Sequence, residues 1–156
     1  MKKTIHAVAG AGGLLLVATF WLSTVASELW GSEAAVIAVK TTIPWLLPVM
    51  VLLMGAAGGT GFSMAPRIRA GRIGAKRRRM PFIALNGVLV LIPCALFLGS
   101  RAAAGQFDTG FYTVQALELV AGAINITLLS LNMRDGIAMA RSRTSRNPGH
   151  AKRAGR

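Results

Sequence analysis

Apolar residues in this chain gather in four long blocks separated by short polar segments, rather than recurring at the spacing of an amphipathic helix. The blocks cover residues 7–27, 42–65, 81–100 and 111–133. Each has about 20 residues or more, and at about 1.5 Å per residue each reaches across the roughly 30 Å hydrocarbon core of a bilayer. The pattern predicts an all-α, polytopic membrane protein built as a bundle of four transmembrane helices.

The positions of the lysine and arginine residues orient these spans. Two precede the first span, seven lie between the second and third, and seven follow the fourth, so 16 of the 18 share one side. Only Lys40 and Arg101 fall on the other side, with three of the five acidic residues. Cytoplasmic segments are enriched in Lys and Arg, so we expect both termini and the 66–80 loop in the cytoplasm, with the spans in the bacterial inner (plasma) membrane.

The domain organisation follows from the same pattern. Residues 1–140 form one predicted membrane domain, and the basic segment 141–156 lacks large apolar side chains. We expect this tail to be disordered in the cytoplasm. The first span leaves an alternative open, because Lys2, Lys3 and the small residues that end at Ser27 loosely resemble a secretory signal peptide. The apolar run is long for such a peptide, which favours a retained first span.

Composition narrows the classes of protein that fit. Hydrophobic residues make up 53% and charged residues 15%, while the formal net charge is +13. So much apolar surface excludes an intrinsically disordered chain and argues against a soluble nucleic-acid-binding domain. The basic segments also lack interleaved aromatic residues that would stack on bases. We expect these cations to contact anionic lipid head groups at the cytoplasmic face, with an acidic partner subunit as the alternative.

Small residues indicate where two of the helices pack. Gly55 and Gly59 form a small-xxx-small pair in the second span, and Gly12 and Gly13 lie near the cytoplasmic end of the first. Such residues let helix backbones approach closely in lipid. The sequence therefore predicts a contact between the first two helices through these four glycines.

Prolines predict where the helices bend. Pro44 and Pro48 fall in the first turns of the predicted second span, where a helix tolerates proline, while Pro93 lies in the middle of the third. Proline removes an N–H donor and clashes with the preceding turn, so Pro93 is expected to kink its helix.

Polar side chains form a stripe along the fourth span. At about 100° per residue, Gln115, Glu118, Asn125 and Asn132 share one face of a helix about 100° wide. Such a stripe cannot face lipid, so we expect it to point into the bundle.

Glu118 needs a partner at this depth, about 10 Å below the outer end of the span. An ionised carboxylate there requires a cation, or it binds a proton. Lys40 has a long side chain at the outer end of the second span and is the best-placed candidate, followed by Arg101. Asn86 enters from the third span near the depth of Asn125 or Asn132. The set forms either a proton-linked polar site or a hydrogen-bond network that fixes helix register.

A cofactor is not predicted, and haem is a weak alternative. A haem-binding bundle needs axial ligands on facing helices. His6 lies at the cytoplasmic end of the first span, whereas Met50 and Met54 lie toward the outer half of the second, which is poor geometry for a shared haem. No metal-ligand spacing and no nucleophile–base pair occurs, so the sequence does not indicate a hydrolase or transferase.

Three classes of function fit these observations. We expect the protein to contact other membrane subunits or further copies of itself. The first class is a non-enzymatic accessory or assembly subunit of an inner-membrane complex. The second is a small proton-coupled transporter or exporter that uses the intramembrane Glu118. The third is a haem or redox-handling membrane protein. The sequence favours the first.

Overall fold

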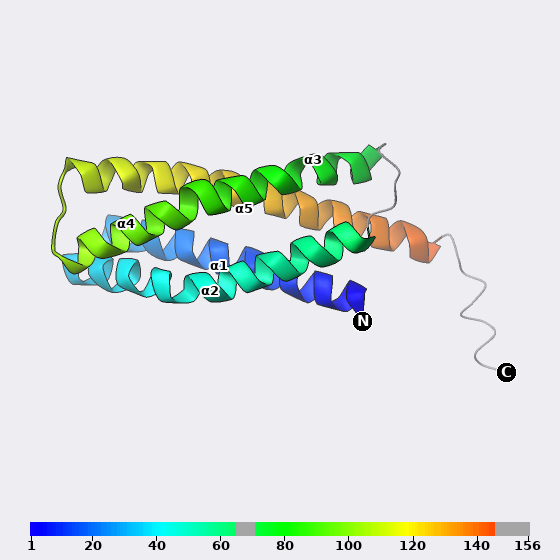
Figure 1. Ribbon diagram of the computed structural model, residues 1–156, viewed down its shortest axis with the longest axis horizontal. Helices are drawn as coiled ribbons and strands as arrows, with labels where there is room; N and C mark the ends of the chain where they lie inside the picture. The colour runs from blue at the N-terminus through cyan, green and yellow to red at the C-terminus, as the bar shows by residue number, and fades with distance from the viewer. Residues whose placement is uncertain (65–70, 146–156) are drawn as a thin grey trace.

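The computed structural model describes residues 1–64 and 71–145, which form helices joined by short connections. The elements are α1 (Lys2–Trp30), α2 (Glu33–Met64), α3 (Gly71–Asn86), a π-helical turn η1 (Gly87–Leu91), α4 (Ile92–Ala103) and α5 (Thr109–Ser145). The elements α3, η1 and α4 follow one another as a single column across the bundle (Figure 1). The prediction of an all-helical protein with four helices long and apolar enough to cross a membrane is confirmed.

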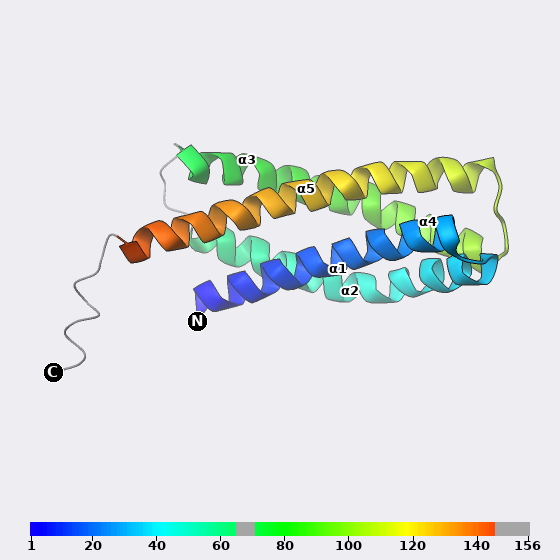
Figure 2. The ribbon, with the colours of Figure 1, turned by 180° about the vertical axis from the view of Figure 1, so that it is seen from behind.

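The four columns run alternately in opposite directions. α1 packs against α2 and α5, while α4 packs against α2 and α5. The start of α1 and the last turns of α5 lie at the same end of the bundle (Figure 2). That end is here called the inner end, and the end with the short connections 31–32 and 104–108 is called the outer end.

Two apolar clusters form the core along the bundle axis. One lies near the middle and includes Val17, Leu47 and Ala95, and the other lies toward the outer end and includes Leu98 and Phe111. Most other large apolar side chains are exposed, as lipid-facing residues are in a membrane bundle. Along α5, the outer part of the polar stripe, Gln115 and Glu118, lies between Val114 of the outer cluster and Ile126 of the middle cluster.

The helices extend beyond the apolar blocks. α2 begins at Glu33 rather than at residue 42, because the chain turns only at Gly31 and Ser32, where the Ser32 Oγ accepts a bond from the Ala35 N–H (3.3 Å). α5 continues to Ser145, past the predicted end of its span and past residue 141, where we expected the tail to begin. The rest of that tail, residues 146–156, lies outside the described residues.

The prediction for the prolines of the second span was wrong. Because α2 begins at Glu33, Pro44 and Pro48 lie inside the helix. Pro44 has no N–H to donate to the carbonyl of Lys40 four residues earlier. At this point α4 approaches closely, since a Cβ placed on Gly99 would lie 2.9 Å from that carbonyl oxygen and 2.8 Å from Pro44 Cγ.

The third column departs from α geometry just before Pro93. η1 ends where the Ile92 N–H bonds to the Gly87 carbonyl, a π-type bond across five residues. Pro93 follows at the start of α4, where its missing N–H falls next to this widened turn. The irregularity expected from Pro93 therefore takes the form of a π turn on its N-terminal side.

The predicted glycine contact is only half correct. Gly12 and Gly13 do face α2, against the side chains of Leu53 and Met54. Gly55 and Gly59, however, have open space around them and lie on an exposed face of α2. The contact with α1 uses another side of α2. On that side Leu53 lies against Gly12, and the Ala57 carbonyl accepts a hydrogen bond from His6.

Candidate functional site: a buried polar cluster

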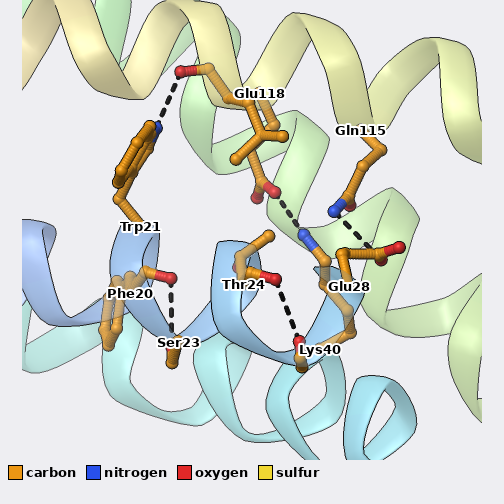
Figure 3. A network of polar contacts seen from close by, with 10 residues as sticks. Phe20, Trp21, Ser23, Thr24, Glu28, Lys40, Gln115 and Glu118 are labelled. Carbon is orange, nitrogen blue, oxygen red and sulfur yellow. Dashed lines mark hydrogen bonds and ion pairs between the residues drawn. The ribbon is translucent and has the colours of Figure 1, made fainter. Parts of the chain in front are cut away.

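Lys40 and Glu118 form an ion pair between α2 and α5 in the outer half of the bundle. The Lys40 side chain is 1% exposed and that of Glu118 is 13% exposed. Lys40 projects from α2 toward the polar stripe of α5, where its ammonium meets the Glu118 carboxylate (Figure 3). Charges so far from water require a close partner, and each supplies it for the other.

A second carboxyl group from α1 joins this pair. The Gln115 Nε2 donates a hydrogen bond to Glu28 Oε1 (3.0 Å), and the two side chains point toward one another (Figure 3). Gln115 is buried, and its Oε1 has no hydrogen-bond partner. Glu28, Lys40, Gln115 and Glu118 are here called the outer polar cluster; they come from three helices.

Trp21 attaches α1 to α5 next to this cluster. Its Nε1 donates to the Leu119 carbonyl (2.9 Å), and its ring lies over Gly122, where a Cβ would come within 2.8 Å of Cδ1. The absence of a side chain at residue 122 therefore lets the indole approach the helix backbone.

A small, partly open pocket of about 50 Å³ lies beside Trp21. Its walls are mainly apolar, and Thr24 and Glu118 are the polar residues among those that line it. One water needs roughly 10–15 Å³ of such space, so the pocket has room for more than one beside the carboxylate. Glu118 thus contacts Lys40 and also lines a small, partly open pocket.

The inner half of the stripe makes hydrogen bonds to the third column. Asn86 Nδ2 donates to the Asn125 Oδ1 (3.1 Å) and to the Ala121 carbonyl (2.9 Å). Asn132 is buried; its Nδ2 lies 3.5 Å from the Met80 sulfur, and its Oδ1 lacks a partner. One turn from Asn132, Asp135 pairs with Arg79 Nη1 (2.8 Å). The stripe therefore faces α3 along its inner half, as it faces α1 and α2 along its outer half.

Replacing Asn86 with leucine is expected to lower the stability of the bundle by about 1 kcal/mol, because interhelical hydrogen bonds in membranes contribute about 0.6 kcal/mol each. Thr127→Val is the control, since the Thr127 hydroxyl bonds only within its own helix, to the Ala123 carbonyl. The measurement is the midpoint of unfolding in detergent. Equal midpoints for the two variants would contradict a role for Asn86 in joining α3 to α5.

His6 attaches the inner end of α1 to α2. Its Nδ1 lies 2.9 Å from the Ala57 carbonyl oxygen and 3.3 Å from the Thr60 hydroxyl. This ring nitrogen therefore has interhelical partners on α2, whereas Met50 is packed in the apolar cluster near the middle of the bundle. Among the described residues, no three His, Cys, Asp or Glu side chains gather where they could hold a metal ion.

The remaining cations are distributed between the two ends. Arg101, the second candidate partner of Glu118, pairs instead with Asp108 (3.2 Å) and Gln106 (2.7 Å) at the outer end. In the predicted basic loop 66–80, Arg79 is the one cation whose side chain is described; Arg67, Arg69 and the cations of 146–156 lie outside the described residues.

We compared the chain with known proteins. It matches no protein-family model, no curated protein and no solved structure. The site therefore has to be interpreted from its own chemistry.

Sequence reasoning missed Glu28 and Trp21. The first apolar block ends at Ser27, so the block pattern leaves Glu28 among the three acidic residues beyond the outer ends of the spans, whereas α1 continues to Trp30. A signal was present, because Trp21, Thr24 and Glu28 have the spacing of one helix face. Extending that face by one turn would have directed Glu28 toward the stripe.

Proposed function

We propose that this protein is a non-enzymatic accessory or assembly subunit of a membrane complex in the bacterial inner membrane. The observation that supports this best is that the polar side chains of α5 bond to the other helices of the bundle. Along α5 they bond to Glu28 of α1, Lys40 of α2 and Asn86 of α3. Bonds of this kind fix the register of the helices, which suits a scaffold that presents a constant lipid-facing surface to other subunits.

The proposed orientation places both termini in the cytoplasm. The distribution of 16 of the 18 cations supports it. In a Cys94→Ser background, single cysteines at Thr4 and Gln106, both exposed, provide labels for the two ends. A membrane-impermeant thiol reagent added to spheroplasts is expected to label residue 106 and not residue 4. Labelling of residue 4 alone would reverse the orientation.

The subunit role is tested by affinity purification in a mild detergent, followed by size-exclusion chromatography and mass spectrometry. We expect the tagged chain to elute with other membrane proteins in fixed proportion. Asn86→Leu is expected to reduce this co-elution, while Thr127→Val leaves it unchanged. A chain that elutes alone, or only with copies of itself, would contradict the proposal.

A second candidate function is proton-coupled transport. It is favoured by Glu118, which pairs with Lys40 and lines the small, partly open pocket. Reconstituted vesicles separate the two functions. A transporter would couple substrate flux to a pH gradient, and Glu118→Gln would abolish that coupling. A scaffold would show no flux in either form.

A further inference from the structure

The outer polar cluster contains two carboxyl groups and one ammonium group. Lys40 is 1% exposed and pairs with Glu118, so the charges of these two side chains neutralise one another. Glu28 interacts electrostatically with both Lys40 and Glu118, but the group that donates a hydrogen bond to it is the neutral Gln115 amide. If both carboxyl groups were ionised, the cluster would hold one negative charge without a counterion of its own in a low-dielectric region. Such a charge is costly, and binding a proton removes the cost.

The Gln115 amide points to where that proton lies. Its Nε2 already donates to Glu28 Oε1 at 3.0 Å, while its Oε1 is buried without a donor. An ionised carboxylate can only accept hydrogen bonds, so it cannot supply the missing donor. A neutral carboxylic acid has one O–H and can form a paired set of two hydrogen bonds with a primary amide. Protonation of Glu28 thus satisfies both groups at once.

We propose that Glu28 is a proton-binding site within the membrane, neutral at pH 7, with its O–H donated from Oε2 to the Gln115 Oε1. The carboxylate takes up one proton from solvent, and no other covalent bond forms or breaks. Glu28 lies two residues before the outer end of α1 and is only partly buried, so the proton exchanges with the outer side. This inference does not rest on the proposed subunit function, which requires no proton.

The surrounding groups assign the proton to Glu28 rather than to Glu118. Glu118 accepts a hydrogen bond from the Lys40 ammonium, so its carboxylate has a counterion in direct contact. From the third column, the Cys94 thiol is the titratable group that interacts with this pair. At the outer end, Arg101 pairs with Asp108 instead of approaching the cluster. Glu28 is the carboxyl group left with a neutral partner.

Infrared spectroscopy of the full-length protein in lipid nanodiscs tests this directly. At pH 7 we expect a carbonyl stretching band from one protonated carboxyl group per chain, which shifts in D₂O and disappears as the pH is raised. Glu28→Gln is expected to remove the band. Glu33→Gln is the matched control, because Glu33 is exposed at the start of α2, and should leave it intact.

A second variant tests the hydrogen bond itself. Gln115→Leu is expected to keep the protonated band but move it to higher wavenumber, because the acid loses its amide partner. If Glu28→Gln fails to elute as a folded species, the position of the band in Gln115→Leu decides. The proposal is overturned if the native protein has no protonated band, if the band survives in Glu28→Gln, or if Gln115→Leu leaves its position unchanged. None of these outcomes depends on whether a partner complex is found.

Discussion

Replacing Lys40 with methionine is expected to lower the free energy of unfolding by about 3–5 kcal/mol. Methionine has a similar length but no charge, so the variant leaves Glu118 without its ammonium partner between two buried apolar clusters. The measurement is unfolding in detergent followed by circular dichroism.

Two further variants separate the ion pair from general packing. Arg101→Met breaks the outer pair with Asp108. The side chains of Arg101 and Asp108 are 34% and 53% exposed, so this variant should lower the free energy of unfolding by less than about 1 kcal/mol. The double variant Lys40→Met with Glu118→Gln removes both charges and should recover much of the lost stability. If Lys40→Met were no more harmful than Arg101→Met, the buried pair would have no special energetic role.

Gly99→Ala is expected to destabilise the bundle by about 1–3 kcal/mol. The new Cβ would come within 2.9 Å of the Lys40 carbonyl oxygen and 2.8 Å of Pro44, so α2 and α4 would have to move apart. Part of this contact is backbone and cannot rotate away. The shift would also disturb the position from which Lys40 reaches Glu118.

Gly55→Ala provides the matched control for this substitution. Gly55 also lies in α2, but nothing lies within 4 Å of the position that its Cβ would take. Its effect should stay within about 0.5 kcal/mol, as for surface substitutions elsewhere. Equal losses in the two variants would show that the close approach of α4 to Pro44 does not limit stability.

The direction of the polar stripe could be predicted from the sequence because helical periodicity alone sets it. Gln115, Asn125 and Asn132 are buried, and Glu118 meets Lys40. The apolar blocks likewise predicted four helices that are long and apolar enough to span a membrane. These features depend on local geometry and on the cost of exposing polar groups to lipid, and both can be evaluated from neighbouring residues.

Contacts between helices could not be predicted in the same way. Gly55 and Gly59 have the spacing of a packing motif, yet they face away from α1. The rotation of a helix about its axis depends on all its neighbours together, and for α2 these include Glu118 of α5, Gly99 of α4 and His6 of α1. A small-residue pair gives one preference among several, and here the buried ion pair and the close approach of α4 determine the outcome.

By itself, the sequence determined the four apolar helices and the face of α5 that turns inward, because both follow from the hydrophobic effect and the period of the helix. Only the tertiary structure decided which groups that face meets. It brought Glu28 to Gln115, directed Arg101 to Asp108 and left the amide oxygen of Gln115 without a donor. Helix ends and rotations set these distances, and they result from the packing of all four columns at once.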